Sequence, residues 1–226
     1  MGWESFHMRK SDQKRQAILD AAYGLFRTQG FERTSVSEIT ARVGGSKATI
    51  YSYFPSKEEL FVECMMQASE KFTSQAFEKL TVTQQGLEPA LREFGISYLR
   101  FACSTEMVAV RRVMIAEAER SGIGRMFYAK IESWRAKMVA FLAECMAAGK
   151  LRHDDAVLAA DQLRALLEAE VLEALLLSAR KNTISNDESV RLAERAVDAF
   201  LRIYPPDPSR GRENDIHRSG QRRHRK

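Results

Sequence analysis

The 226-residue sequence predicts an all-α protein of about nine helices, and three observations support this fold class. Apolar residues recur every three or four positions along most of the chain, which is the spacing of one face of an α-helix. Serine or aspartate precedes many of these segments and glycine or proline follows them, as at helix ends. No segment alternates apolar and polar residues strongly enough to predict a β-strand.

Residues 1–10 are expected to form a flexible arm, and the first helix is expected from about Ser11 to Gln29. Gly30 is the expected C-cap, because glycine readily adopts the left-handed backbone that often ends a helix. Residues of this helix that have helical spacing are expected to face a core: Ile18, Ala22, Leu25 and Phe26.

The stretch from Thr34 to Phe61 predicts two short helices followed by the start of a long one. Ser35 and Glu38 form a capping-box pattern at the first short helix, and Ser56 and Glu59 repeat it at the long helix. A tight turn between the short helices needs a permissive backbone, which two glycines supply: Gly44 and Gly45.

The outward side of the second short helix carries small, hydroxylated or aromatic side chains, one cation and no acid. These residues are Ser46, Lys47, Ala48, Thr49, Tyr51 and Tyr53. A short helix with such a surface, held between two other helices, is typical of a recognition helix in a DNA major groove.

The long helix is expected to run from Ser56 to about Leu80, and five further helices follow it. Their expected ranges are 87–102, 105–120, 125–148, about 154–179 and about 186–204. Three prolines after residue 204 stop the last helix, and residues 205–226 are polar and rich in arginine. This segment is expected to be a disordered basic tail, either merely solvated or in nonspecific contact with nucleic acid.

The formal net charge of +5 lies at the two ends of the chain. Residues 1–60 carry +2, residues 205–226 carry +4, and residues 61–204 carry −1. This distribution argues against a protein that coats a polyanion uniformly, and it favours docking by geometry.

The sequence offers no pattern of a catalytic site, so no enzyme activity, cofactor or metal ion is expected. The histidines lie in the predicted tails and one loop, without the arrangement of a triad or a metal cluster. Cys64, Cys103 and Cys145 are far apart and are expected to be reduced core thiols of a cytoplasmic protein, with a thiol sensor as the alternative. The N-terminus lacks a signal-peptide pattern, and no stretch reaches the ~20 apolar residues of a membrane span.

The segment from Gln16 to Phe61 resembles the N-terminal module of the TetR/AcrR family of bacterial transcriptional regulators. Its most specific part is SKATIYSYF (46–54) followed by SKEELF (56–61). Gly45 stands where the family usually has a hydrophobic residue, which is expected to loosen the turn, and Thr40 stands where alanine is usual. Two weaker segments, Met114–Arg120 and Ala196–Leu201, are similar to the AefR-like C-terminal subgroup.

The resemblance implies a helix-turn-helix DNA-binding domain at 11–55 and a helical regulatory and dimerisation domain at 56–204. By matching positions it implies that the outward residues of the second short helix, Ser46 to Tyr53 as given above, face DNA. It also implies that Lys57 meets a phosphate at the start of the long helix, and that Thr34 and Ser37 lie near the DNA backbone.

The resemblance further implies a pocket for a small-molecule effector in the regulatory half. Few charges interrupt its aromatic and methionine side chains, so the effector is expected to be largely apolar. The candidate lining residues, each of which could equally fill an ordinary core, are Phe72, Phe94, Tyr98, Phe101, Met114, Phe127, Trp134 and Met138. Glu168 could answer a cationic group or lie exposed.

The last two predicted helices have faces more apolar than a monomer needs, which favours a four-helix dimer contact over a monomer core. The residues concerned are Leu172, Leu175, Leu176, Ala193, Ala196 and Phe200. Together these features predict a homodimeric repressor that a largely apolar molecule releases from a palindromic double-stranded DNA operator, with no membrane partner. The alternatives are an architectural DNA-binding protein without ligand control, a thiol-responsive regulator, and a small-molecule carrier or enzyme that keeps a vestigial DNA-binding module.

Overall fold

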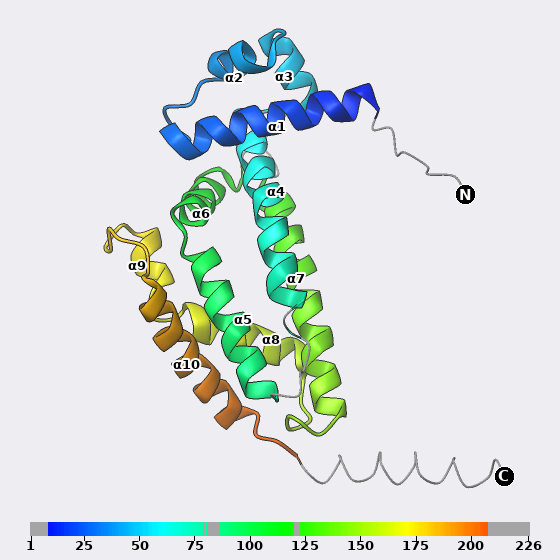
Figure 1. Ribbon diagram of the computed structural model, residues 1–226, viewed down its shortest axis with the longest axis vertical. Helices are drawn as coiled ribbons and strands as arrows, with labels where there is room; N and C mark the ends of the chain where they lie inside the picture. Colours follow the sequence, from blue (N-terminus) through cyan, green and yellow to red (C-terminus); the bar gives the residue numbers. More distant parts are fainter. Residues whose placement is uncertain (1–8, 79, 81–85, 120–122, 208–226) are drawn as a thin grey trace, which may run out of the picture. The chain divides into compact units, whose positions relative to one another are not determined.

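The computed structural model describes residues 9–78, 80, 86–119 and 123–207, and every regular element in this part is an α-helix (Figure 1). The all-α prediction is therefore confirmed. The ten helices are α1 (Lys10–Gln29), α2 (Val36–Val43), α3 (Lys47–Tyr53), α4 (Lys57–Glu78), α5 (Leu87–Ala102), α6 (Thr105–Glu117), α7 (Ile123–Ala147), α8 (Ala156–Glu168), α9 (Leu172–Leu176) and α10 (Asn186–Ile203).

The tenth helix arises because the segment predicted as one helix at 154–179 forms both α8 and α9. The sequence favours a single helix because its apolar residues keep one helical spacing: Leu163, Leu167, Val171 and Leu175. In the structure Val171 has φ −137°, and Val171 and its neighbour Leu172 are both buried. The φ of Val171 lies outside the helical range, which separates α9 from the helical residues before it.

The chain divides into two compact units, here called unit 1 (residues 1–71 and 109–127) and unit 2 (residues 72–108 and 128–226). In unit 1, buried side chains from α1, α2, α3 and α4 form the core, among them Ile18, Leu25, Ile39, Ile50, Phe54 and Leu60. Phe61 of α4 joins them, with its ring centroid 5.0 Å from that of Phe26 and 4.9 Å from that of Phe31. The first turns of α4 are thereby packed on α1 and on the loop after it.

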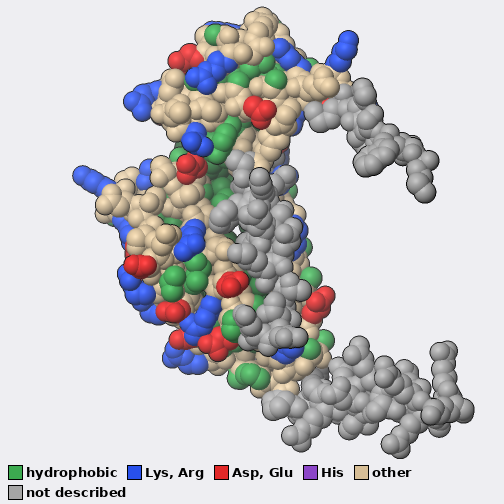
Figure 2. Space-filling model, in the orientation of Figure 1, with side chains coloured by type: hydrophobic (Ala, Val, Ile, Leu, Met, Phe, Trp, Pro, Cys, Tyr) green, Lys and Arg blue, Asp and Glu red, His purple; other side chains and the backbone are tan. Residues whose placement is uncertain are grey.

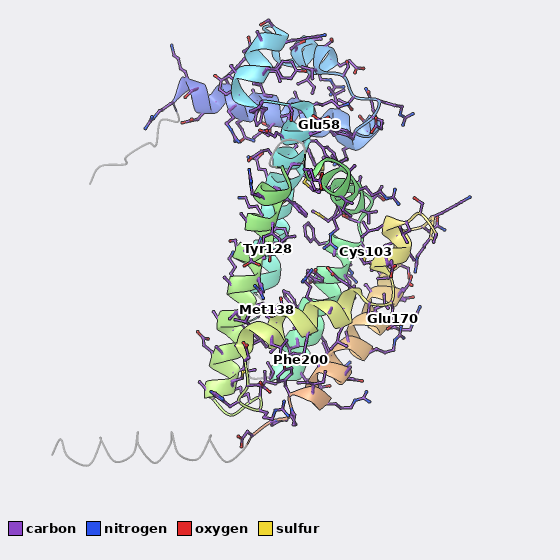
Figure 3. The ribbon with its side chains drawn as sticks, turned by 180° about the vertical axis from the view of Figure 1, so that it is seen from behind. Glu58, Cys103, Tyr128, Met138, Glu170 and Phe200 are labelled. Atoms are coloured by element: carbon purple, nitrogen blue, oxygen red, sulfur yellow. The ribbon has the colours of Figure 1, made fainter. Side chains whose placement is uncertain are left out.

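In unit 2, α5 and α10 lie side by side and α8 packs against both (Figure 1). Its buried core includes Met138 of α7 and Phe200 of α10, which Figure 3 labels. At Gly95 of α5 the neighbouring helices approach closely. A Cβ atom at this position would lie 3.0 Å from Leu167 Cδ2 and 3.2 Å from Ala193 Cβ.

Some sequence predictions lie wholly or partly outside the described residues. The predicted arm is described only at Arg9 and Lys10, and Lys10 already belongs to α1. The predicted basic tail is described only at residues 205–207. The domain boundary after residue 55 stays a prediction. Within the described part, none of the helices combines the length and the apolar character that crossing a membrane requires.

Candidate functional site

Both short helices of the predicted helix-turn-helix begin with a capping box. At α2, Glu38 N donates to Ser35 Oγ (3.2 Å), and Ser35 N donates to Glu38 Oε2 (2.8 Å). Ser35 N and Ser35 Oγ both donate to the Glu38 carboxylate, which favours its charged form and lowers the pKa of Glu38. At α3, Thr49 N donates to Ser46 Oγ (3.2 Å), and Ser46 N donates to Thr49 Oγ1 (3.3 Å). The first box confirms the sequence prediction, and the second is a variant in which threonine replaces the usual Glu or Gln.

The connections before and after α3 are also defined by local contacts. Gly44 and Gly45 both have positive φ, at +74° and +108°, a region that residues with a Cβ atom rarely adopt. After α3, Ser56 Oγ accepts a hydrogen bond from Glu59 N (3.0 Å), which is the serine half of the capping box predicted there. The two glycines thus set the direction in which α3 leaves α2.

The surface of α2 and α3 carries most of the side chains that the sequence predicts near DNA. Ile50 is 1% exposed and holds the inner side of α3 to the core, whereas Tyr51 beside it is 45% exposed. Exposed or half-buried residues of this surface are Ser37, Ser46, Lys47, Ala48, Thr49, Tyr51 and Tyr53. Figure 2 shows the Lys and Arg side chains of this region set among acidic and uncharged ones, in keeping with its mild charge.

Thr34 does not belong to this surface, although the sequence predicts it near the DNA backbone. Its side chain is 1% exposed, and its Oγ1 donates a hydrogen bond to Gly30 O at 2.8 Å. Thr34 therefore stabilises the loop between α1 and α2 from inside.

Lys57 also has internal partners where the sequence predicts a phosphate contact. Its Nζ donates to Phe31 O (3.0 Å) and Thr34 O (3.1 Å), and it lies 4.2 Å from the centroid of the Phe31 ring. The ammonium group thus joins the first residue of α4 to the loop between α1 and α2. Carbonyl acceptors have no sequence pattern, so this role is not predictable from the chain alone.

Two basic residues of α1 have similar internal contacts that the sequence does not predict. Lys14 Nζ donates to Val43 O (3.1 Å) and Gly44 O (3.0 Å) at the C-terminus of α2. Arg15 pairs with Glu63 of α4 at 2.9 Å and lies over the Phe54 ring at 4.9 Å. Part of the positive charge of this module therefore stabilises its own fold.

The predicted effector residues are distributed over both units. In unit 2 the rings of Phe94 and Tyr98 stack at 5.9 Å, and those of Phe101 and Trp134 meet edge to face at 5.6 Å. Three of these four side chains are half-buried, whereas Phe94 is buried with Met138. In unit 1, Met114 is buried and Phe127 is half-buried, and the side chain of Phe72 lies outside the described part of the structure.

A polar contact lies beside these rings in unit 2. The Tyr98 hydroxyl donates to Glu168 of α8, whose carboxylate is also 3.5 Å from Arg164 Nη1. The Glu168 side chain is 15% exposed, so it already has partners within the protein in a half-buried setting.

The residues predicted for the dimer contact lie largely in the core of unit 2. Leu172, Leu175, Ala193, Ala196 and Phe200 are each 8% exposed or less, and Leu176 is half-buried against that core. Those of α10 pack it onto α5 and α8, and Leu175 of α9 belongs to the same core, so these side chains are already covered within one protomer. An amphipathic pattern shows that a face is buried but not against which partner.

The cysteines and the acidic groups give no sign of a second kind of site in the described residues. Cys64, Cys103 and Cys145 are free and buried. Burial raises the pKa of Cys64 to about 12 and that of Cys145 to about 11, so both thiols are protonated at neutral pH. Among the residues that the structure describes, no group of three or more metal-ligating side chains comes together.

These features define a helix-turn-helix DNA-binding protein with a second, helical domain. They are the capped helices α2 and α3, the exposed face of α3 and the helical unit 2. Comparisons with known proteins agree with this class. The family model of bacterial regulatory proteins of the tetR family matches residues 18–64. The model of the AefR-like transcriptional repressor C-terminal domain matches residues 89–206.

Individual relatives agree over most of the chain. The HTH-type transcriptional regulator BetI of Rhizobium meliloti (strain 1021) is 28% identical over 191 residues, which cover 84% of this chain and 90% of that protein. A TetR-family regulator from Mesorhizobium loti MAFF303099 superposes with a TM-score of 0.75 at 27% identity, over 87% of this chain and 99% of that one. The flavonoid-responsive regulator FrrA is 31% identical, with a TM-score of 0.62 over 87% of this chain and 98% of its own.

The chain belongs to the TetR family of bacterial transcriptional regulators and has an AefR-like C-terminal domain. It is a DNA-binding regulator of the repressor type and not an enzyme.

Proposed function

We propose that the protein represses transcription by binding a near-palindromic operator as a homodimer, with α3 of each protomer in a major groove, and that a largely apolar small molecule releases it. The observation that carries the proposal is the outward face of α3, which is capped, anchored by Ile50 and free of acidic residues. One such face offers few groups that distinguish bases, so two copies on two half-sites are needed for a specific affinity.

Each side chain of the face suits a particular kind of contact. Lys47 can donate to guanine acceptors or to a phosphate, and Ala48 can touch a thymine methyl group. Tyr51, Tyr53 and Ser37 carry hydroxyls that suit phosphate oxygens and so position the module. Ser46 and Thr49 have part of their hydrogen-bonding capacity in the α3 cap, so we assign them first to the cap and second to DNA. Thr34 and Lys57 are left out of the set because their polar groups have internal partners.

Selection of bound duplexes from a random DNA pool tests this proposal directly. A palindrome with half-sites about 34 Å apart or a multiple of that spacing is the expected result. Binding to all duplexes alike, with no enriched sequence, would favour an architectural DNA-binding protein instead.

A tyrosine substitution tests the assignment of α3. Tyr51→Ala is expected to weaken binding to the selected operator by roughly 5- to 150-fold, because it removes a positioning contact. Tyr128, which is 59% exposed on α7, provides the matched control, since Tyr128→Ala removes an exposed tyrosine outside the helix-turn-helix. Gel shifts measure affinity and circular dichroism checks folding. Equal affinity of Tyr51→Ala and wild type would contradict the assignment.

We assign the dimer contact to the outward faces of α8 and α10. Leu158 and Val157 of α8 are 46% and 42% exposed, and Ile203 of α10 is 40% exposed. Ala165 of α8 and Ala169, the residue that follows α8, are exposed and continue from Leu158 at helical spacing, which gives a small, apolar outer strip. Two copies related by a twofold axis would pack these strips against each other.

The half-buried aromatic side chains of unit 2 support a largely apolar effector with a polar group. Tyr98, Phe101 and Trp134 offer ring surface, and the Tyr98–Glu168 pair offers a hydrogen-bonding group beside it. Because the relative FrrA is flavonoid-responsive, a flavonoid is the first compound to test. Release of the operator by a flavonoid, weakened in Trp134→Ala, is the expected result. Release that is the same in Trp134→Ala and wild type would place the effector elsewhere.

A further inference from the structure

Two successive glycines, Gly44 and Gly45, connect α2 to α3 and are here called the α2–α3 turn. Gly44 has φ +74° and ψ 150°, and Gly45 has φ +108°. Residues with a Cβ atom rarely adopt such conformations, and glycine loses more conformational freedom on folding than any other residue. The backbone of this turn therefore defines the direction of α3 only weakly without a further contact.

Lys14 of α1 supplies such a contact. Its Nζ donates to Val43 O (3.1 Å) and to Gly44 O (3.0 Å). These carbonyls belong to the peptide groups before and after Gly44, so the two bonds together restrict rotation about the φ and ψ of this residue. Carbonyls at the end of a helix lack helical partners and lie at its negative end, where a cation is favourable.

The core of unit 1 holds Lys14 beside the turn. Lys14 lies one helical turn before Ile18, which is 0% exposed, so its side chain starts from the side of α1 that faces the core. On α3, Ile50 is also buried, but apolar packing has no preferred direction. The hydrogen bonds of Lys14 add the direction that this packing lacks.

We propose that Lys14 is a positioning residue for operator binding, which acts by fixing the α2–α3 turn and thereby the direction in which α3 enters a major groove. The inference rests on the operator binding proposed above. When Lys14 is replaced, the turn samples other conformations, and only the fraction of molecules with α3 in its bound direction is competent to bind the operator. The apparent operator affinity falls with that fraction.

Positioning and phosphate binding by Lys14 predict different effects of its loss. A lysine that neutralises a phosphate releases counterions, so its loss reduces the slope of log K against log salt by about 0.9 and weakens nonspecific binding as well. A positioning residue matters where the exact direction of α3 matters. Its loss weakens operator binding and leaves both the salt slope and the affinity for a random duplex unchanged.

Hydrogen exchange of the free protein, followed by mass spectrometry, tests the first step. The amide of Gly44 donates to Thr40 O (2.8 Å) and that of Thr49 donates to Ser46 Oγ, so the peptide 43–50 reports on the turn and on the start of α3. Lys14→Met is expected to speed exchange in this peptide roughly 3- to 30-fold and to leave exchange in α5 unchanged. Wild-type exchange in the peptide of Lys14→Met would overturn the inference.

Fluorescence anisotropy of the full-length variants tests the second step, with the selected operator and a random duplex over a range of salt concentrations. Lys14→Met is expected to bind the operator roughly 3- to 30-fold more weakly, with the wild-type salt slope and random-duplex affinity. Lys14→Arg keeps a cation with several N–H donors and is expected to restore most of the operator affinity and the slow exchange. If circular dichroism shows that Lys14→Met does not fold, Lys14→Gln, which keeps a neutral donor, provides the same comparison.

Lys10 provides the matched control, because it is exposed on α1 one helical turn before Lys14. Lys10→Met removes the same charge and is expected to keep the wild-type exchange of the turn and the wild-type preference for the operator over a random duplex. A slope reduced by about 0.9 for each Lys14 lost, or an operator affinity of Lys14→Met equal to that of wild type, would contradict positioning. A wild type that prefers no selected duplex would refute the proposed function and the role of Lys14 in DNA binding with it. The exchange of the free protein shows separately whether Lys14 fixes the turn.

Discussion

Burial disfavours the thiolate form of Cys64 and Cys145 at neutral pH. Their pKa values of about 12 and about 11 have burial as the main cause, and the thiolate is the reactive form of cysteine. Cys64 Sγ in addition lies 3.4 Å from Leu19 O, as a donor to that carbonyl. These properties are the opposite of those of a sensor cysteine and speak against the thiol-responsive alternative.

Thiol labelling provides the first test at this scale. Native protein is expected to react slowly with Ellman's reagent at neutral pH, and protein unfolded in guanidinium is expected to react at all three cysteines. Diamide should not release the operator. Rapid labelling of the native protein, together with operator release by diamide, would restore the thiol-responsive alternative.

The same shifts predict how stability changes at alkaline pH. The pKa of each thiol is higher in the folded chain than the ~8.5 of an exposed cysteine, so the unfolded chain loses its protons first. The stabilisation is complete below about pH 8.5 and is lost as the pH rises toward the folded values. Guanidinium unfolding at increasing pH should show this loss, and Cys64→Ala should reduce the pH dependence. A pH dependence that is the same in Cys64→Ala and wild type would contradict the role of this thiol.

Two glycines of unit 1 provide a pair of substitutions with opposite expected signs. Gly45 has φ +108°, so Gly45→Ala forces a residue with a Cβ atom into an unfavourable backbone region and should destabilise by about 1 kcal/mol. Gly24 lies inside α1, and a Cβ atom there meets only Arg42 Nη1 at an ordinary 3.6 Å. Gly24→Ala should therefore stabilise by roughly 0.5–1 kcal/mol. Guanidinium unfolding measures the free energy of unfolding of both variants. An equal loss of this free energy in the two would contradict the backbone argument.

At the scale of helices, the close approach of α5 to α8 and α10 depends on a small residue at position 95. A Cβ atom at Gly95 would meet the flexible end of Leu167 at 3.0 Å and the Cβ atom of Ala193 at 3.2 Å. Gly95→Ala requires small shifts, whereas Gly95→Leu cannot be accommodated without separating α5 from α10. We expect losses of about 1 and up to about 3 kcal/mol of unfolding free energy, respectively, from overpacking. Thermal unfolding measures them, and two variants as stable as wild type would contradict the packing described for unit 2.

The sequence predicts the helices well where its patterns are local. The range predicted for α5, about 87–102, agrees with the observed Leu87–Ala102, because the aligned apolar residues from Leu91 to Phe101 are a local signal. The Ser35–Glu38 box is predicted because both partners lie within one turn. The break between α8 and α9 is not predicted, because the apolar spacing continues through it.

The candidate site was predictable in its outline and not in its internal contacts. The exposed face of α3 follows from a periodic pattern that leaves Ile50 as its buried anchor. The partners of Lys14, Lys57 and Thr34 are carbonyl oxygens, which every residue has and which leave no trace in the side-chain sequence. Such contacts depend on where the loop between α1 and α2 lies in space.

At the scale of the whole molecule, the apolar residues predicted for the dimer contact are buried within the protomer itself. Ala193 and Phe200 are 0% exposed because α10 already packs on α5 and α8 within the protomer. In the proposed dimer, a partner would therefore contact the outer faces of these helices. Glu170, labelled in Figure 3, and Arg195 of α10 pair at 2.7 Å, which links α10 to the segment after α8.

A charged residue on the outer strip of α8 tests the dimer and its relation to DNA binding. Leu158→Glu places a carboxylate on each protomer at the proposed twofold contact, where the two charges would be desolvated next to each other. Light scattering is expected to show a monomer, with operator affinity lost while the circular dichroism spectrum stays that of wild type.

Leu177 provides the control, because it is 71% exposed at the end of α9, away from this strip in sequence, and Leu177→Glu should remain a dimer. A dimer in both variants would move the contact away from the α8 strip, and a monomer in both would mean that the contact extends to α9. Since a monomer has only one α3, Leu158→Glu should still bind a single half-site weakly, which separates the loss of pairing from a loss of the DNA-binding surface.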